Sequence, residues 1–95
     1  MANINFYNVT VSKADTTNQV VVRGEVENRS GSNYNAVAIR IILFKKNIVM
    51  ANTVTVVNGL FAGKTKNFEK TVEDLDYTLV VKDLTHWEIF SESTY

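Results

Sequence analysis

The stretch Tyr34–Lys45, YNAVAIRIILFK, decides the fold that we expect for this chain of 95 residues. It is rich in β-branched residues and its side chains alternate with the period of a strand. One face carries Val37, Ile39, Ile41 and Leu43. The other face carries Ala36, Ala38, Ile42 and Phe44, interrupted by Arg40. Because both faces are largely apolar, the stretch predicts a central strand.

The same alternation continues on both sides of this stretch. Further strands are expected over residues 4–11, 19–28, 48–57, 66–72, 77–81 and 86–90. About seven short strands separated by turn residues predict an all-β, immunoglobulin-like, two-sheet antiparallel β-sandwich, built as a single domain of residues 1–95. The expected core comprises Val22, Val26, Val37, Ile39, Ile41, Leu43, Val54, Val56, Leu60, Phe68 and Leu79.

One segment also fits a helix. Phe68, Val72 and Leu75 are spaced at i, i+4 and i+7, which is helical spacing. Residues 66–75 are therefore open to either interpretation, strand or helix.

Composition excludes several classes of function. Ten basic residues balance ten acidic ones, so the chain lacks the positive charge expected of a nucleic-acid binder. Cysteine is absent, which removes disulfide frameworks and zinc–thiolate sites. No apolar run is long enough to span a bilayer, so we expect no direct membrane insertion by this segment.

Three motifs could belong to a binding or catalytic site, but each lacks residues or spacing that such a site needs. Gly59–Thr65 resembles a phosphate-binding loop but has one residue too few between its glycines. Glu73–Asp76 offers carboxylates without the spacing or glycine of a calcium loop. His86, the single histidine, would have to serve as the base of any hydrolase, and on a strand it shares a face with Glu88. We therefore expect a non-enzymatic protein with no cofactor and no metal site.

Several blocks of the sequence resemble the FxLYD domain, a small bacterial and archaeal module. Val22–Ser30 matches its V-x-G-x-V-x-N-x-S block, and Ile41–Lys45 occupies the position of the naming motif, keeping the leucine and an aromatic residue. Further matches are Tyr34, Val37, Ile39, Leu60, Gly63 and Phe68. The aspartate of the naming motif is absent after Phe44, which puts the turn Lys45–Asn47 in doubt. The resemblance implies an immunoglobulin-like sandwich, usually on secreted or membrane-anchored envelope proteins, with no established reaction.

Two residues of the first block have a structural interpretation. Gly24 leaves room for a large neighbour, either Trp87 or Phe68. Asn28 can hydrogen-bond nearby backbone where its strand ends.

The first functional hypothesis is a cell-envelope or extracellular module for protein interaction or domain spacing, cut from a longer secreted chain. A cytoplasmic protein is the alternative location. The module would bind a protein partner or a second copy through an exposed sheet edge, or through a patch on the outer face of the central strand. The patch residues are Arg40, Ile42, Phe44 and Lys45.

The alternative hypothesis is a module that binds a small ligand or a polysaccharide. Such a module needs surface aromatic residues beside polar groups. The candidates are Tyr34, Phe61, Trp87 and Tyr95.

Overall fold

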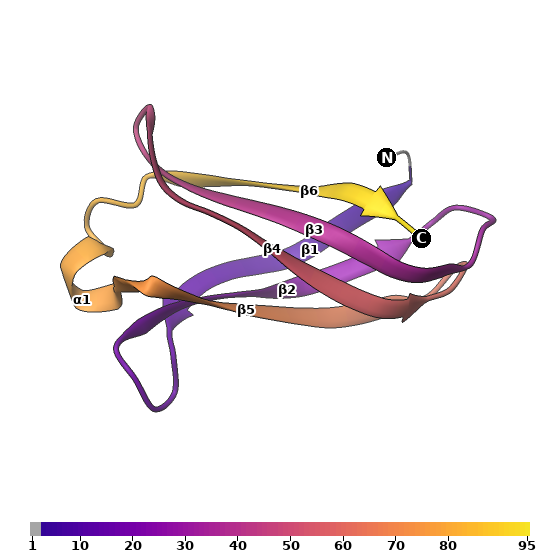
Figure 1. Cartoon of the computed structure of the whole chain (residues 1–95), viewed down its shortest axis with the longest axis horizontal. Coiled ribbons are helices and arrows are strands. Elements are labelled where there is room, and N and C mark those ends of the chain that lie inside the picture. The colour runs from indigo at the N-terminus through magenta and orange to yellow at the C-terminus, as the bar shows by residue number, and fades with distance from the viewer. Residues whose placement is uncertain (1–2) are drawn as a thin grey trace.

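The computed structural model describes residues 3–95 and is built almost entirely of strands (Figure 1). The elements are β1 (Ile4–Lys13), β2 (Gln19–Asn28), β3 (Tyr34–Lys45), β4 (Ile48–Leu60), β5 (Thr65–Asp76), the one-turn helix α1 (Tyr77–Val80) and β6 (His86–Thr94). The described residues thus form six strands rather than about seven. No helix within residues 3–95 has the length and apolar character needed to cross a bilayer.

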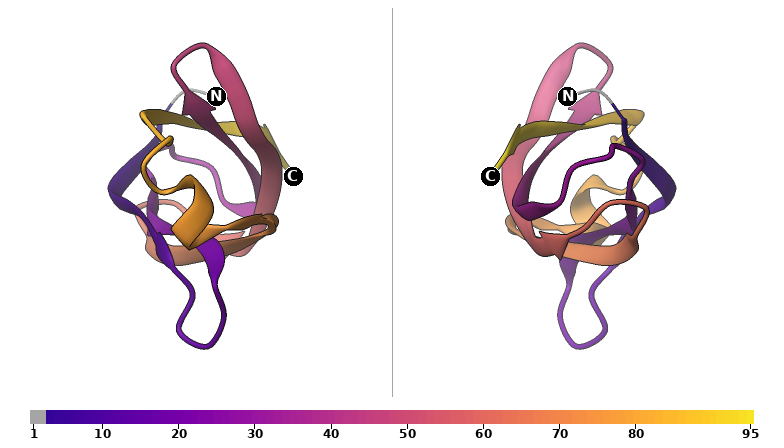
Figure 2. Two further views of the ribbon diagram at one scale, coloured as in Figure 1. Left: turned by 90° about the vertical axis from the view of Figure 1, so that its left-hand side faces the viewer. Right: turned by 90° about the vertical axis from the view of Figure 1, so that its right-hand side faces the viewer.

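The strands form two antiparallel sheets of three. One sheet has the order β1-β2-β5 and the other the order β4-β3-β6. Figure 2 shows the two layers end-on, with the β1–β2 and β3–β4 turns projecting in opposite directions. The prediction of an all-β, two-sheet antiparallel sandwich with β3 as a central strand is confirmed.

The core lies between the inward faces of the two central strands. Val37, Ile39, Ile41 and Leu43 of β3 are almost completely buried, as the alternation predicts. They face Val20, Val22 and Val26 of β2, with Leu60, Phe68 and Val72 closing the same cluster. Burying each such side chain contributes about 1.5–3 kcal/mol.

Three residues expected in the core are exposed instead. Val54 and Val56 of β4 lie opposite Arg40 and Ala38, which puts them on the outer face of the sheet. The inward positions of β4 belong to Thr53, Thr55 and Val57, since the first two pair with the buried Ile41 and Ile39.

The third correction concerns the segment 77–81, which is not a strand. The main-chain carbonyl of Asn18 accepts a hydrogen bond from the Tyr77 N–H (2.6 Å), and its side-chain Oδ1 accepts one from the Thr78 N–H (3.2 Å). These contacts with a distant turn hold Tyr77–Val80 in a helical turn, and Leu79 on it is 72% exposed. Tertiary contacts therefore override the strand propensity of this segment.

Residues 66–75 form a strand rather than a helix. Thr65–Val72 pairs residue by residue with β2, and Phe68 and Val72 both face the core. The register then shifts, because Val72 pairs with Val20 whereas Asp76 pairs with Gln19. This irregularity turns Leu75 towards the core as well. It explains why Phe68, Val72 and Leu75 have helical spacing in the sequence although they lie on a strand.

Gly24 makes room for Phe68, one of the two neighbours proposed from the sequence. A Cβ atom at Gly24 would lie 2.8 Å from the Phe68 Cζ and 3.1 Å from a methyl group of Val9. The Phe68 ring also packs edge-on against Phe6, with centroids 6.1 Å apart. Trp87, the other proposed neighbour, is 42% exposed and lies on the opposite sheet.

Asn28 is the one fully buried polar side chain of β2, and all of its hydrogen-bonding groups are used. Its amide nitrogen donates to the carbonyls of Ser32 (2.7 Å) and Leu60 (3.0 Å). Its Oδ1 accepts from both the N–H (2.9 Å) and the hydroxyl (2.6 Å) of Ser30. The side chain thus bonds nearby backbone, as predicted, and also joins the end of β2 to the end of β4.

Candidate functional site

The outer face of the β4-β3-β6 sheet brings together apolar side chains around one ion pair. At its centre, the Arg40 guanidinium forms a two-point contact with the Glu92 carboxylate, with N–O distances of 2.8–3.0 Å. Its Nη1 also donates to Oδ1 of Asn52 (2.9 Å). Arg40 therefore connects all three strands of the sheet, and its charge is compensated where it stands.

Apolar side chains flank this ion pair on each strand. Val54 and Val56 lie on β4, Ile42 on β3, and Phe90 on β6, directly opposite Arg40. Val56 is 51% exposed and Phe90 43% exposed. We call the set Arg40, Ile42, Val54, Val56 and Phe90 the outer-face patch.

The outer face of the other sheet has a different character. There Arg23 pairs with Glu69, Asn8 donates to Glu25, and Tyr7 donates to Glu27 (2.9 Å). The hydrogen bond to Glu27 is the main cause that raises the pKa of Tyr7 above the ordinary value for tyrosine. This face is covered by paired polar groups, whereas the outer-face patch leaves apolar surface in contact with solvent.

The four residues predicted for an interaction surface divide into two groups. Arg40 and Ile42 belong to the outer-face patch. Phe44 lies at the end of the same sheet, where its ring stacks on His86 at 4.6 Å between centroids. Lys45 points away from the patch and pairs with Asp83 at 3.6 Å.

The turn after Phe44 closes without the aspartate that the resemblance leads one to expect. Lys46 adopts a positive φ of 53°, and its N–H donates to the hydroxyl of Thr85 (2.8 Å). That hydroxyl also contacts Nδ1 of His86 (3.1 Å). The surroundings of His86 are therefore the Phe44 ring and the hydroxyl of Thr85, the residue that precedes it.

The four aromatic residues predicted for ligand binding do not form one site. Tyr34, at the start of β3, packs against the core, and Phe61 and Tyr95 lie exposed near the same end of the sandwich. Trp87 pairs with Leu43 towards the other end of β3. The structure thus separates Trp87 from the rest.

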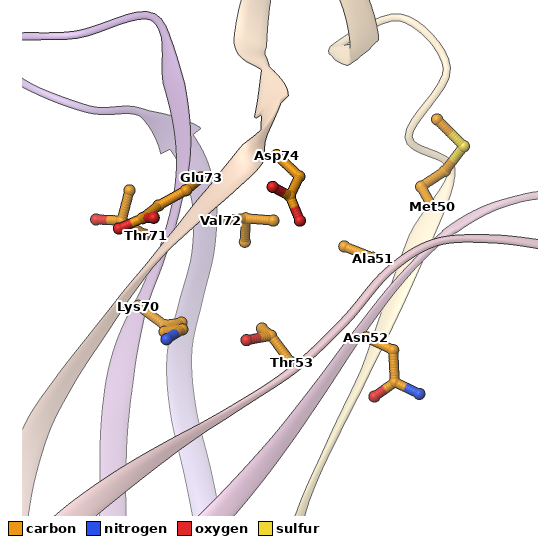
Figure 3. A pocket seen from close by; sticks show the side chains of 9 residues that line it. All are labelled: Met50, Ala51, Asn52, Thr53, Lys70, Thr71, Val72, Glu73 and Asp74. Carbon is orange, nitrogen blue, oxygen red and sulfur yellow. The ribbon is translucent and has the colours of Figure 1, made fainter.

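A hollow of about 310 Å³ lies between the edge strands β4 and β5 (Figure 3). Thr53, Val72 and Asp74 lie between the two strands in Figure 3, and Lys70 and Glu73 complete the charged wall. A second hollow of about 340 Å³ follows the same strands further along. Neither is lined by any of the four candidate ligand aromatics, so these walls offer no ring from that set on which a sugar could stack.

The glycine loop 59–63 uses its backbone N–H groups internally. The Gly63 N–H donates to the carbonyl of Asn28 (2.8 Å), and the Ala62 N–H donates to Oδ1 of Asn33 (2.9 Å). These are the donors that a phosphate would require. Residues 3–95 also hold no cluster of three or more histidine, aspartate or glutamate side chains placed to hold a metal ion.

Sequence reasoning missed three residues of the outer-face patch. It assigned Val54 and Val56 to the core and left Phe90 without a role. The positions of Val54 and Val56 could have been predicted from Asn52 and Asn58. All four residues alternate along the strand and so lie on one face, and asparagine favours the solvent side of a strand.

Comparisons of the chain with known protein families, with characterised proteins and with solved structures found no match.

Proposed function

We propose that the chain is a non-enzymatic interaction module that binds a protein partner through the outer-face patch. The observation that supports this is the contrast between the two outer faces. One is covered by paired polar groups, whereas the other exposes Val54, Val56 and Phe90 around the Arg40–Glu92 pair. Exposed apolar side chains gathered on one face, with an arginine among them, are typical of protein-binding sites.

The Arg40–Glu92 pair would determine how a partner is oriented on this surface. An arginine held by two contacts at the centre of an apolar patch is a frequent anchor of protein interfaces. Its carboxylate partner fixes the guanidinium plane, so a bound protein would meet a preorganised donor. The proposed partner therefore presents apolar side chains around an acceptor group.

We further propose that the module works in the cell envelope or outside the cell. The support is the resemblance of Val22–Ser30 to FxLYD domains, which usually belong to secreted or anchored proteins. Fractionation of the source cells, with mass spectrometry of the native N-terminus, tests this. A processed or lipid-modified form in the envelope fraction supports the location, and a free cytosolic chain contradicts it.

Site-specific photocrosslinking in the source cells tests the binding surface. A benzoylphenylalanine at Val56 should give a discrete adduct, whereas the same group at the exposed Thr10, on the outer face of β1, should give none. The adduct should disappear when Val54→Lys places a charge beside the probe. Equal adducts at both sites, or an adduct insensitive to Val54→Lys, would contradict binding through the outer-face patch.

A further inference from the structure

Each sheet ends in two edge strands, and three of these four edges are protected against pairing with another chain. β1 is interrupted by a bulge between Tyr7 and Thr10, where Asn8 has a φ of 53°. Bulges twist an edge away from a would-be partner. The edge of β1 is therefore blocked near its middle.

Lysine side chains protect the edge of β5, and β4 is interrupted by a bulge at Met50, opposite Leu43 and Phe44. Lys66 and Lys70 of β5 stand opposite Val26 and Val22, at positions that share the parity of the core-facing Phe68. Charges pointing inward on an edge strand are a common defence against strand addition. The Lys66 ammonium also donates to the main-chain carbonyl of Asn58 (2.7 Å), which occupies a backbone acceptor of β4.

The edge of β6 has no such protection over His86–Ser91. This run pairs with β3 in unbroken register, from His86 opposite Phe44 to Ser91 opposite Ile39, and a bulge at Glu92 follows it. It contains neither proline nor lysine. Within residues 3–95, no strand pairs with its second edge. Trp87 and Phe90, on opposite faces of the strand, remain 42% and 43% exposed.

We propose that this edge pairs with the same edge of a second copy of the chain. Two β6 strands would run antiparallel about a two-fold axis perpendicular to the sheet, forming one continuous sheet in the order β4-β3-β6-β6-β3-β4. In this arrangement the free N–H and C=O groups of each β6 edge form hydrogen bonds with those of the other copy. The axis also places the outer faces of both copies on the same side of the joined sheet.

Charge and strand length together favour one register of this pairing. Axes at Trp87 or Ser91 bring no two glutamates together but pair fewer residues of the unbroken run His86–Ser91. With the axis at Ile89, Glu88 lies opposite the Phe90 position of the second copy, and the regular pairing ends before the bulge at Glu92. Axes at Glu88 or Phe90 would instead set glutamates directly against each other, which is destabilising. The register centred on Ile89 also sets Trp87 opposite the small, buried Ser91 position, so each copy covers the other's tryptophan.

Self-pairing goes beyond the proposed function and does not depend on it. An edge contact leaves Val54 and Val56 exposed on the far strand of each sheet, so two patches would lie on one continuous surface. Because edge-to-edge contacts bury little area, we expect an association of micromolar strength or weaker.

Sedimentation equilibrium, followed together with Trp87 fluorescence, tests the proposal on the intact chain. Trp87 is the single tryptophan, so its emission reports on this edge alone. From micromolar to millimolar protein, the mass should rise from monomer to dimer. Emission should move to shorter wavelength, and acrylamide quenching should fall, over the same concentration range.

Two variants at one position test the register. Phe90→Glu places a carboxylate opposite Glu88 of the second copy and should weaken the dimer about tenfold or more. Phe90→Lys removes the same ring but offers an ion pair there, and should retain the dimer. The stability of the monomer should follow the opposite order. Residue 90 lies opposite Arg40 within one chain, so a glutamate there is attracted to Arg40 and a lysine is repelled by it. An effect on monomer stability therefore cannot mimic the predicted order.

Three outcomes would overturn the proposal. One is a strict monomer across the whole concentration range. Another is a dimer that Phe90→Glu leaves unchanged. The third is a dimer that both variants weaken equally, which would indicate association through the apolar outer-face patch instead. Crosslinking at Val56 remains a separate readout, so failure of self-pairing and failure of the proposed function are distinguishable.

Discussion

Replacing Asn28 by aspartate should destabilise the fold by about 2–6 kcal/mol at neutral pH. The substitution preserves shape but converts the amide nitrogen, which donates to the Ser32 and Leu60 carbonyls, into a carboxylate oxygen. Losing two donors to buried or half-buried carbonyls costs about 1–3 kcal/mol. Placing a charge against those oxygens, at a site with no exposed area, adds a penalty of similar size.

This deficit should shrink as the pH falls. Burial beside two carbonyls raises the pKa of the introduced carboxyl group, because only its protonated form can donate a hydrogen bond. The folded state therefore binds the proton more tightly than the unfolded state. Acidification through the raised pKa restores stability relative to the wild type, which is opposite in sign to an ordinary ion-paired aspartate.

Urea unfolding from neutral to mildly acidic pH measures both effects. The matched control is Asn58→Asp, the same change at an exposed position of β4, which should alter the free energy of unfolding by less than about 0.5 kcal/mol. For a domain of this size, a loss of 3 kcal/mol lowers Tm by about 12–24 °C. Equal effects of the two substitutions, or a deficit at Asn28 that is independent of pH, would refute the role assigned to its amide.

Gly24→Ala should destabilise the protein by about 1–3 kcal/mol, because its methyl group meets the Phe68 ring at 2.8 Å. Thermal unfolding measures this loss. Adding Phe68→Leu should recover part of it, and Gly31→Ala, with open space around it, should be nearly neutral; a similar loss at Gly31 would contradict the steric account. Glu27→Ala should lower the raised pKa of Tyr7 towards the ordinary tyrosine value, since it removes both the hydrogen-bond acceptor and its charge. An NMR titration of the Tyr7 ring carbon measures this shift, and an unchanged titration would contradict the assigned cause.

Alternation along the chain was sufficient to predict the architecture. On β3 both faces are largely apolar, but Arg40 interrupts one of them, which marks the face of Val37, Ile39, Ile41 and Leu43 as the inward one, and the structure adopts it. Where two phases both carried apolar residues, the pattern was ambiguous. Val54 and Val56 compete with Thr53, Thr55 and Val57 on β4, and the register against β3 decides between them.

The candidate site was predictable only in part, for the same physical reason. Arg40 interrupts an apolar face, so its position on the outer side of β3 could be predicted from β3 alone. Its partners Glu92 and Asn52 lie on the two neighbouring strands, 52 and 12 residues away in the chain. Such partners depend on strand pairing, which periodicity within one segment does not encode.

The pairing of β2 with β5 has a consequence for the order of folding. These strands are neighbours in one sheet although β3 and β4, which belong to the other sheet, lie between them in the chain. The β3–β4 hairpin needs only a short loop, whereas β2 and β5 must close a loop that contains this whole hairpin. We therefore expect the hairpin to form early and β5 to dock late, in a slow, single cooperative transition on the timescale of milliseconds to seconds.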